Sequence, residues 1–203
     1  FPKADIKAYL EKNLVGFKIG KTDWEYISNS FVIFPLIGFH FDDFGHGPGN
    51  AVITQSGADI CTTAVQVDRT QAHAGVQCVN GLFMSTLRVG EKNMGPVKLT
   101  NCGFWTVPET EEQVVKLGPS TLMLTACHCA DWDSTGQGHA CLRAAGGRLL
   151  VSGCDFMANG KQPIILEKGL KATVITGCLF RGSEAVSDQG SEAEVQLGFN
   201  TTR

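Results

Sequence analysis

Short hydrophobic strand patterns recur along the chain at a nearly constant interval. Each pattern alternates apolar and polar residues and has a small residue at its sixth position. Four of the units have cysteine there: Val97–Phe104, Leu122–Cys129, Leu149–Phe156 and Thr173–Phe180. Three earlier units fit the same frame with Gly81, Ser56 and Ser30 at this anchor position. The spacing between successive anchors averages about 25 residues, so the chain is an internal repeat.

Each unit predicts a strand, a bend and a second strand. The residue three positions before the anchor is always apolar or a thiol, and the residue two positions after it is usually large and apolar. The residue just before the anchor is Asn or Gly in five of the seven units. These two residue types tolerate a left-handed backbone, which suits a tight bend between two strands of period two.

A second class of apolar segments lies between the units, at the same spacing. Its members are Val114–Leu117, Ala140–Arg143, Ile164–Glu167 and Glu194–Leu197. The patterns of leucine-rich repeats and of hexapeptide β-helices are absent. The sequence therefore predicts an all-β fold, a right-handed parallel β-helix (solenoid) of about seven turns.

The repeat also predicts what fills the core. The anchor cysteines would stack on successive turns and point inward as reduced, small hydrophobic residues: Cys102, Cys127, Cys154 and Cys178. Disulfides between turns and a cysteine-rich metal site are the alternatives. Cysteines stacked along the axis of the rod do not bring four ligands around one metal ion. A parallel column of phenylalanines is expected beside them: Phe83, Phe104, Phe156 and Phe180.

The N-terminus differs from the repeats. Residues 2–13 read as a short amphipathic helix with Ile6, Tyr9 and Leu10 on one side. A solenoid has an open end to cover, so this segment is interpreted as a capping helix. The expected division is a cap and lead-in over residues 1–20 and the β-helix over residues 21–203.

Composition narrows the class of partner. Among the 203 residues, 43% are hydrophobic and 18% charged, which excludes a disordered chain. The net charge of −3 offers no phosphate-neutralising surface, so no nucleic-acid partner is expected. The longest apolar stretch, residues 31–39, is too short to span a bilayer. The chain starts at Phe1 without an initiator Met, which indicates a processed or partial chain.

Several strings resemble a known family. They are Asp23–Tyr26, Gly45–Asn50, Thr54–Asp59, Gly95–Lys98 and the recurring Gly/Asn-Cys-x-Phe. Together they are similar to the C-terminal part of bacterial pectate-lyase-superfamily proteins, which are related to family 28 glycoside hydrolases. The resemblance implies a right-handed β-helix, an extracellular or periplasmic location, and a polysaccharide or oligosaccharide partner. It also implies an N-terminal half of the same protein that is missing from this sequence.

Three function classes follow from the resemblance. The first is a glycoside hydrolase-like protein that needs neither cofactor nor metal. The second is a non-catalytic glycan-binding or assembly β-helix, like a tailspike or an adhesin. The third is a polysaccharide lyase, for which Lys92 and Lys98 near Arg88 are the candidate base and charge neutraliser.

The predicted catalytic residues are Asp42, Asp43 and His46. Glycoside hydrolysis needs two carboxyl groups on one face, and this loop offers two acids and an imidazole within five residues. The alternative is a solvated turn. Adjacent residues of a strand point to opposite faces, so Asp42 and Asp43 share a groove only if the segment bends.

Further residues are predicted to bind substrate or to supply a second carboxylate. Asp59, Asp68 and His73 lie on the next turn, where they would line the same groove. Asp23 and Trp24 would hold a sugar, the ring against its apolar face and the carboxylate on its hydroxyls. A structural tryptophan at the cap is the alternative for Trp24.

Overall fold

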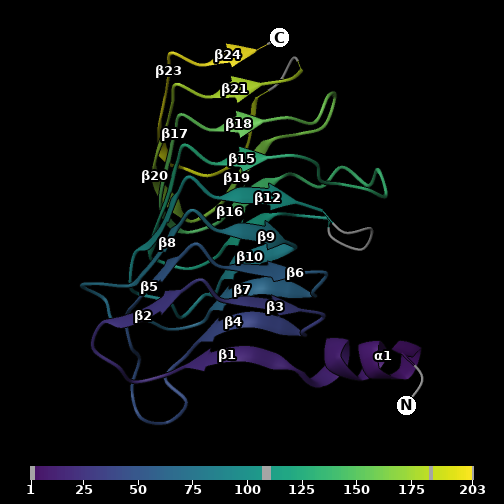
Figure 1. Cartoon of the computed structure of the whole chain (residues 1–203). Coiled ribbons are helices and arrows are strands. Elements are labelled where there is room, and N and C mark those ends of the chain that lie inside the picture. The colour runs from purple at the N-terminus through teal and green to yellow at the C-terminus, as the bar shows by residue number, and fades with distance from the viewer. Residues whose placement is uncertain (1–2, 107–110, 183–184, 203) are drawn as a thin grey trace.

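The computed structural model describes residues 3–106, 111–182 and 185–202. One helix, α1 (Lys3–Asn13), precedes a series of short strands that wind into a right-handed parallel β-helix (Figure 1). The strands form three parallel sheets of eight strands each, so the rod has eight turns. Each turn contributes one strand to each sheet, which confirms the predicted solenoid.

Sheet A carries the first strand of every turn. Its strands, in spatial order, are β1 (Val15–Ile19), β4 (Ile37–Phe41), β7 (Thr63–Val67), β10 (Thr86–Val89), β13 (Val114–Lys116), β16 (Leu142–Ala144), β19 (Ile164–Glu167) and β22 (Val186–Gln189). Three of these strands contain the second class of apolar segments, those near residues 114, 142 and 164.

Sheets B and C hold the two strands of the repeated unit. Sheet B consists of β2 (Glu25–Ser28), β5 (Ala51–Thr54), β8 (Val76–Val79), β11 (Val97–Thr100), β14 (Thr121–Thr125), β17 (Gly147–Ser152), β20 (Leu170–Thr176) and β23 (Glu194–Gly198). Sheet C consists of β3 (Phe31–Ile33), β6 (Gly57–Asp59), β9 (Leu82–Met84), β12 (Gly103–Trp105), β15 (His128–Cys129), β18 (Asp155–Phe156), β21 (Leu179–Phe180) and β24 (Thr201–Thr202).

The eighth turn corrects one strand assignment. The segment from Glu194 pairs with β20 in sheet B and so belongs to the repeated unit, not to the intervening class. Its anchor is Asn200, whose Oδ1 accepts the backbone N–H of Cys178 at 2.9 Å and whose Nδ2 donates to the carbonyl of Ile175. The anchor of this turn is Asn, whereas the other anchors are Cys, Ser or Gly, so the anchor pattern in the sequence does not reveal it.

The bend between sheets B and C has the predicted left-handed backbone on every turn. The residue before each of the seven anchors has φ between 50° and 67°: Asn29, Gln55, Asn80, Asn101, Ala126, Gly153 and Gly177. Phe199 takes the same conformation on the eighth turn, with φ of 57°. The bend is therefore set by backbone conformation, and Asn and Gly are common there because they adopt it most readily.

The core is built from stacked columns, as predicted. The four anchor cysteines are buried and none forms a disulfide. Beside them, Phe83, Phe104, Cys129, Phe156 and Phe180 occupy one register position on successive turns and are all buried. The Phe156 and Phe180 rings stack with centroids 5.0 Å apart.

Helix α1 lies where a helix was predicted, and it extends to one side of the first turn (Figure 1). None of its side chains is buried; Ile6 and Tyr9 are exposed. Its Lys7 ammonium lies over the ring of Phe34, 5.3 Å from the centroid. Among the described residues, no helix is long and apolar enough to cross a membrane.

Candidate functional site

Two carboxylates sit side by side where neighbouring strands of sheet A end. Asp42 follows β4 and Asp68 follows β7, and the last residues of these strands, Phe41 and Val67, are paired in register. The two aspartates therefore occupy equivalent positions on successive turns. Phe41 and Val67 are buried, so the residues after them point outward by the alternation of the strand.

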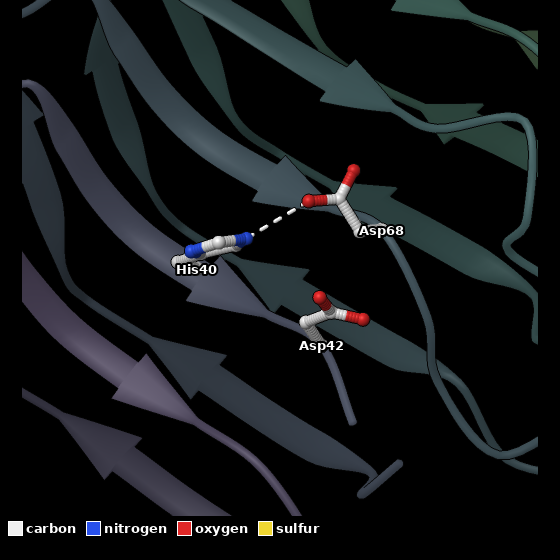
Figure 2. A group of neighbouring side chains, drawn as sticks. All are labelled: His40, Asp42 and Asp68. Carbon is white, nitrogen blue, oxygen red and sulfur yellow. Dashed lines mark hydrogen bonds and ion pairs between the residues drawn. The ribbon is translucent and has the colours of Figure 1, made fainter. Parts of the chain in front are cut away.

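His40 completes a group of three on the outer face of sheet A (Figure 2). Its Nε2 lies 2.9 Å from Oδ2 of Asp68, across the two turns. Gln66 Nε2 donates to the other oxygen, Oδ1 of Asp68, at 2.6 Å. One nitrogen of His40 and one carboxylate oxygen each of Asp42 and Asp68 all lie within 4.8 Å of one another.

Asp43 does not share this face but forms an ion pair with Arg69. Its Oδ1 also accepts the backbone N–H of Gly45 at 3.0 Å. The Gly45 hydrogen bond and the Arg69 guanidinium lower the pKa of the Asp43 carboxyl below its ordinary value. The Arg69 guanidinium also lies 3.8 Å from Oδ1 of Asp42. Asp43 thus orients Arg69 beside the Asp42–Asp68 pair.

A groove of about 310 Å³ opens beside the pair. Besides Asp42 and Asp68, its lining residues are Arg69, Arg88, Gly90, Glu91, Lys92 and Leu117. Three cationic side chains therefore surround the two carboxylates. Gly90 occupies the position equivalent to Asp68 on the following turn, since Val67 and Val89 are paired. A Cβ there would come within 2.7 Å of Oδ1 of Asp68, so glycine leaves that oxygen accessible.

The other residues predicted for catalysis or for sugar binding lie in the connections between sheets A and B. His46 is exposed, and its backbone N–H donates to the carbonyl of Asp43. Asp23 accepts a hydrogen bond from Gln71 Nε2 at 3.0 Å. Trp24 is 52% exposed, and its backbone N–H donates to Oδ1 of Asn50.

The remaining predicted residues separate from the pair. Asp59 ends β6 and lies on sheet C, a different face of the rod from Asp68. His73 is exposed in the connection that follows Asp68. Of the three residues predicted to join Asp42 from the next turn, the structure places Asp68 against it.

Sequence reasoning missed His40 and Gln66. Both were readable from alternation: in Phe39-His40-Phe41 the phenylalanines are buried, so His40 faces outward with Asp42. In the same way Gln66 lies between buried Val65 and Val67 and faces outward with Asp68. Residues that share the outer face of a strand are two positions apart, so a search for adjacent acids does not reveal these pairs.

Comparisons with known proteins add no relative. No protein-family model, no curated protein and no solved structure matches this chain. The parallel β-helix is established by the structure itself.

Proposed function

We propose that this chain is a carbohydrate-active β-helix protein that hydrolyses glycosidic bonds, with Asp42 and Asp68 as its two carboxyl groups. The observation that carries the proposal is their placement on equivalent positions of neighbouring turns, with carboxylate oxygens within 4.8 Å. Retaining glycosidases hold their two carboxyl groups about 5 Å apart, and inverting enzymes hold them farther apart. An oxygen–oxygen separation below 4.8 Å is nearer to the spacing of retaining enzymes, so the proposal includes retention of configuration.

The groove supports an acidic polysaccharide as substrate. Arg69, Arg88 and Lys92 line it together with the carboxylate pair. Fixed cations attract sugar carboxylates or sulfates and place them beside the reacting bond. The proposal includes the predicted relation to pectate-lyase-superfamily proteins and family 28 hydrolases, and an extracellular or periplasmic location.

The test is a screen of neutral and acidic polysaccharides for new reducing ends. We expect cleavage of an acidic glycan by the natural chain and a loss of about 100-fold or more with Asp42→Asn and with Asp68→Asn. Asp188→Asn is the matched control, because Asp188 is exposed on the last turn and its carboxylate accepts hydrogen bonds from the backbone N–H and the hydroxyl of Ser191. Activity that survives both substitutions at the pair would refute the assignment.

Added azide identifies the role of each carboxylate. In a retaining hydrolase, azide takes the place of a deleted nucleophile or intercepts the glycosyl-enzyme when the acid–base residue is deleted, giving opposite anomers of the glycosyl azide. Asp42→Gly and Asp68→Gly are therefore expected to yield different anomers. The same anomer from both would exclude a retaining pair.

A lyase is the second candidate, because Arg88 and Lys92 lie in the same groove as the acids. A lyase product carries a carbon–carbon double bond that absorbs in the ultraviolet. Lys98, which was predicted to assist, lies on β11 in sheet B and not in this groove. Ultraviolet-absorbing products that vanish with Arg88→Gln or Lys92→Gln would favour the lyase.

A further inference from the structure

His40, Asp42 and Asp68 combine the donor types of a metal site. The imidazole nitrogen and the two carboxylate oxygens come from the ends of two neighbouring strands and face one another (Figure 2). All three side chains are partly exposed, with 17% of the side-chain surface accessible for His40, 28% for Asp42 and 37% for Asp68. An ion at the outer face of sheet A therefore reaches these side chains from solvent.

The distances fit a small divalent cation. Zinc binds imidazole nitrogen and carboxylate oxygen at about 2.0–2.2 Å, which at a tetrahedral angle places its ligand atoms about 3.3–3.6 Å from one another. His40 Nε2 and Asp68 Oδ2 lie 2.9 Å apart in a hydrogen bond, so an ion that replaces the shared proton would separate them by about 0.5 Å. Asp42 follows the end of β4 and places one carboxylate oxygen within 4.8 Å of both atoms. Three protein ligands leave the remaining positions for water.

We propose that His40, Asp42 and Asp68 bind one divalent transition-metal ion such as Zn²⁺, and that this ion inhibits the hydrolysis proposed above. The imidazole selects zinc-like ions over Ca²⁺ and Mg²⁺, which prefer oxygen ligands alone. Inhibition follows because the ion occupies both carboxylates that hydrolysis requires. This second half rests on the proposed function, whereas binding does not.

The charges around the site set its strength. Asp43 pairs with Arg69 and so offsets the cation nearest to Asp42. Arg88 and Lys92 also line the groove and oppose a bound cation, while Glu91 favours one. Removal of one of the opposing cations should therefore tighten metal binding and weaken binding of an acidic glycan.

Isothermal titration of the whole chain with ZnCl₂, MnCl₂ and CaCl₂ at pH 7.5 tests the binding. We expect one Zn²⁺ per chain, and a dissociation constant raised about tenfold or more by His40→Ala and by Asp68→Asn. His46→Ala is the matched control, since its exposed imidazole lies in the nearby connection. Circular dichroism of each variant identifies any that fails to fold.

Arg88→Gln gives a gain that misfolding cannot imitate. We expect tighter Zn²⁺ binding by this variant than by the natural chain. Zinc binding that His40→Ala and Asp68→Asn leave unchanged, or that Arg88→Gln does not tighten, would overturn the site.

Activity assays separate the two proposals. Zn²⁺ binding without glycan cleavage would refute the proposed function and leave the metal site standing. Cleavage that persists when Zn²⁺ saturates the site would refute the inhibition. Cleavage without His40-dependent Zn²⁺ binding would refute the metal site alone.

Discussion

The Nε2 of His40 and the Oδ2 of Asp68 lie 2.9 Å apart although 28 residues separate them in sequence. They meet because β4 and β7 pair in register, with His40 beside Gln66 and Phe41 beside Val67. The contact therefore depends on the alignment of these two turns. It also fixes the orientation of a carboxylate that we assign to catalysis.

Loss of the imidazole should lower activity through Asp68. A hydrogen bond to a charged group contributes about 1.5–3 kcal/mol, which corresponds to about 10- to 100-fold in rate. We expect His40→Ala to lower kcat by this factor with KM nearly unchanged, and His40→Gln to restore part of it. Steady-state kinetics on the cleaved glycan measure both. An equal loss with His73→Ala would show that the effect is not local.

The phenylalanine column should dominate stability. Phe104 is fully buried, so Phe104→Ala removes a large apolar side chain and leaves a cavity, at an expected cost of about 3–5 kcal/mol in the free energy of unfolding. Phe199 is 97% exposed, and Phe199→Ala should change that free energy by less than about 0.5 kcal/mol. Urea unfolding measures both. A cost below about 1 kcal/mol for Phe104→Ala would contradict the packed column.

The left-handed bend predicts opposite effects of two small substitutions. Ala126 has φ of 53° and its side chain is exposed, so Ala126→Gly should raise the free energy of unfolding by about 0.5–1 kcal/mol. Gly153 has φ of 62° on the next turn, and a Cβ there would contact nothing within 4 Å. Gly153→Ala should therefore lower the same quantity by about 1 kcal/mol through backbone strain alone. Effects of the same sign would disprove this account.

Native thiols should react slowly. All eight cysteines are buried and free, and burial raises the pKa of Cys61 and of Cys78 to about 12. Because a buried sulfur is shielded from a reagent in solution whatever its pKa, a disulfide reagent should modify the folded chain slowly and all eight thiols once urea unfolds it. Absorbance of the released thiol follows the reaction. Fewer than eight reactive thiols in the unfolded, unreduced chain would indicate disulfides.

Lys116 predicts a pH dependence of stability. Its side chain is fully buried, its Nζ donates to the carbonyls of Gly118 and Gly146, and burial lowers its pKa to about 8. Between about pH 8 and the ordinary value of 10.5, the unfolded chain binds one more proton at Lys116 than the folded chain does. The contribution of Lys116 to the free energy of unfolding therefore rises with pH. Below about pH 8 both states are protonated and its cost is constant.

The measurement is urea unfolding of the natural chain and of Lys116→Met at about pH 7.5 and about pH 10. The difference between the two free energies should shift in favour of the natural chain at the higher pH, which cancels the shared effect of the cysteines. A difference that does not change with pH would show that Lys116 keeps its ordinary pKa in the folded chain.

The repeat was predictable because its signals are local. Each unit has a left-handed residue just before the anchor and an inward residue three positions before the anchor. Both signals lie within a few residues, so the sequence of a single unit reveals its bend and its buried face. The segment from Glu194 was predicted to belong to the intervening class because strands of sheets A and B have the same alternation of apolar and polar residues. Only pairing with β20 distinguishes them.

The site was less predictable because it depends on alignment between turns. The anchors lie at the bends between sheets B and C and are 21 to 27 residues apart, so they do not reveal which residue after β7 lies beside Asp42 at the end of β4 in sheet A. The two connections between these sheets, residues 42–50 and 68–75, have different lengths. Asp68 was a candidate by proximity, but its contact with His40 required the register.

Because the strands of sheet A stack in register, the rod can lose or gain a whole turn without changing the site. Leu142 pairs with Ile164, so loss of residues 142–163 would join Cys141 to a residue in the same register and delete one whole turn. Such a deletion leaves the turns that carry Asp42 and Asp68 untouched. Rods of different lengths can therefore diverge from one ancestor by gain or loss of whole turns while the same groove persists.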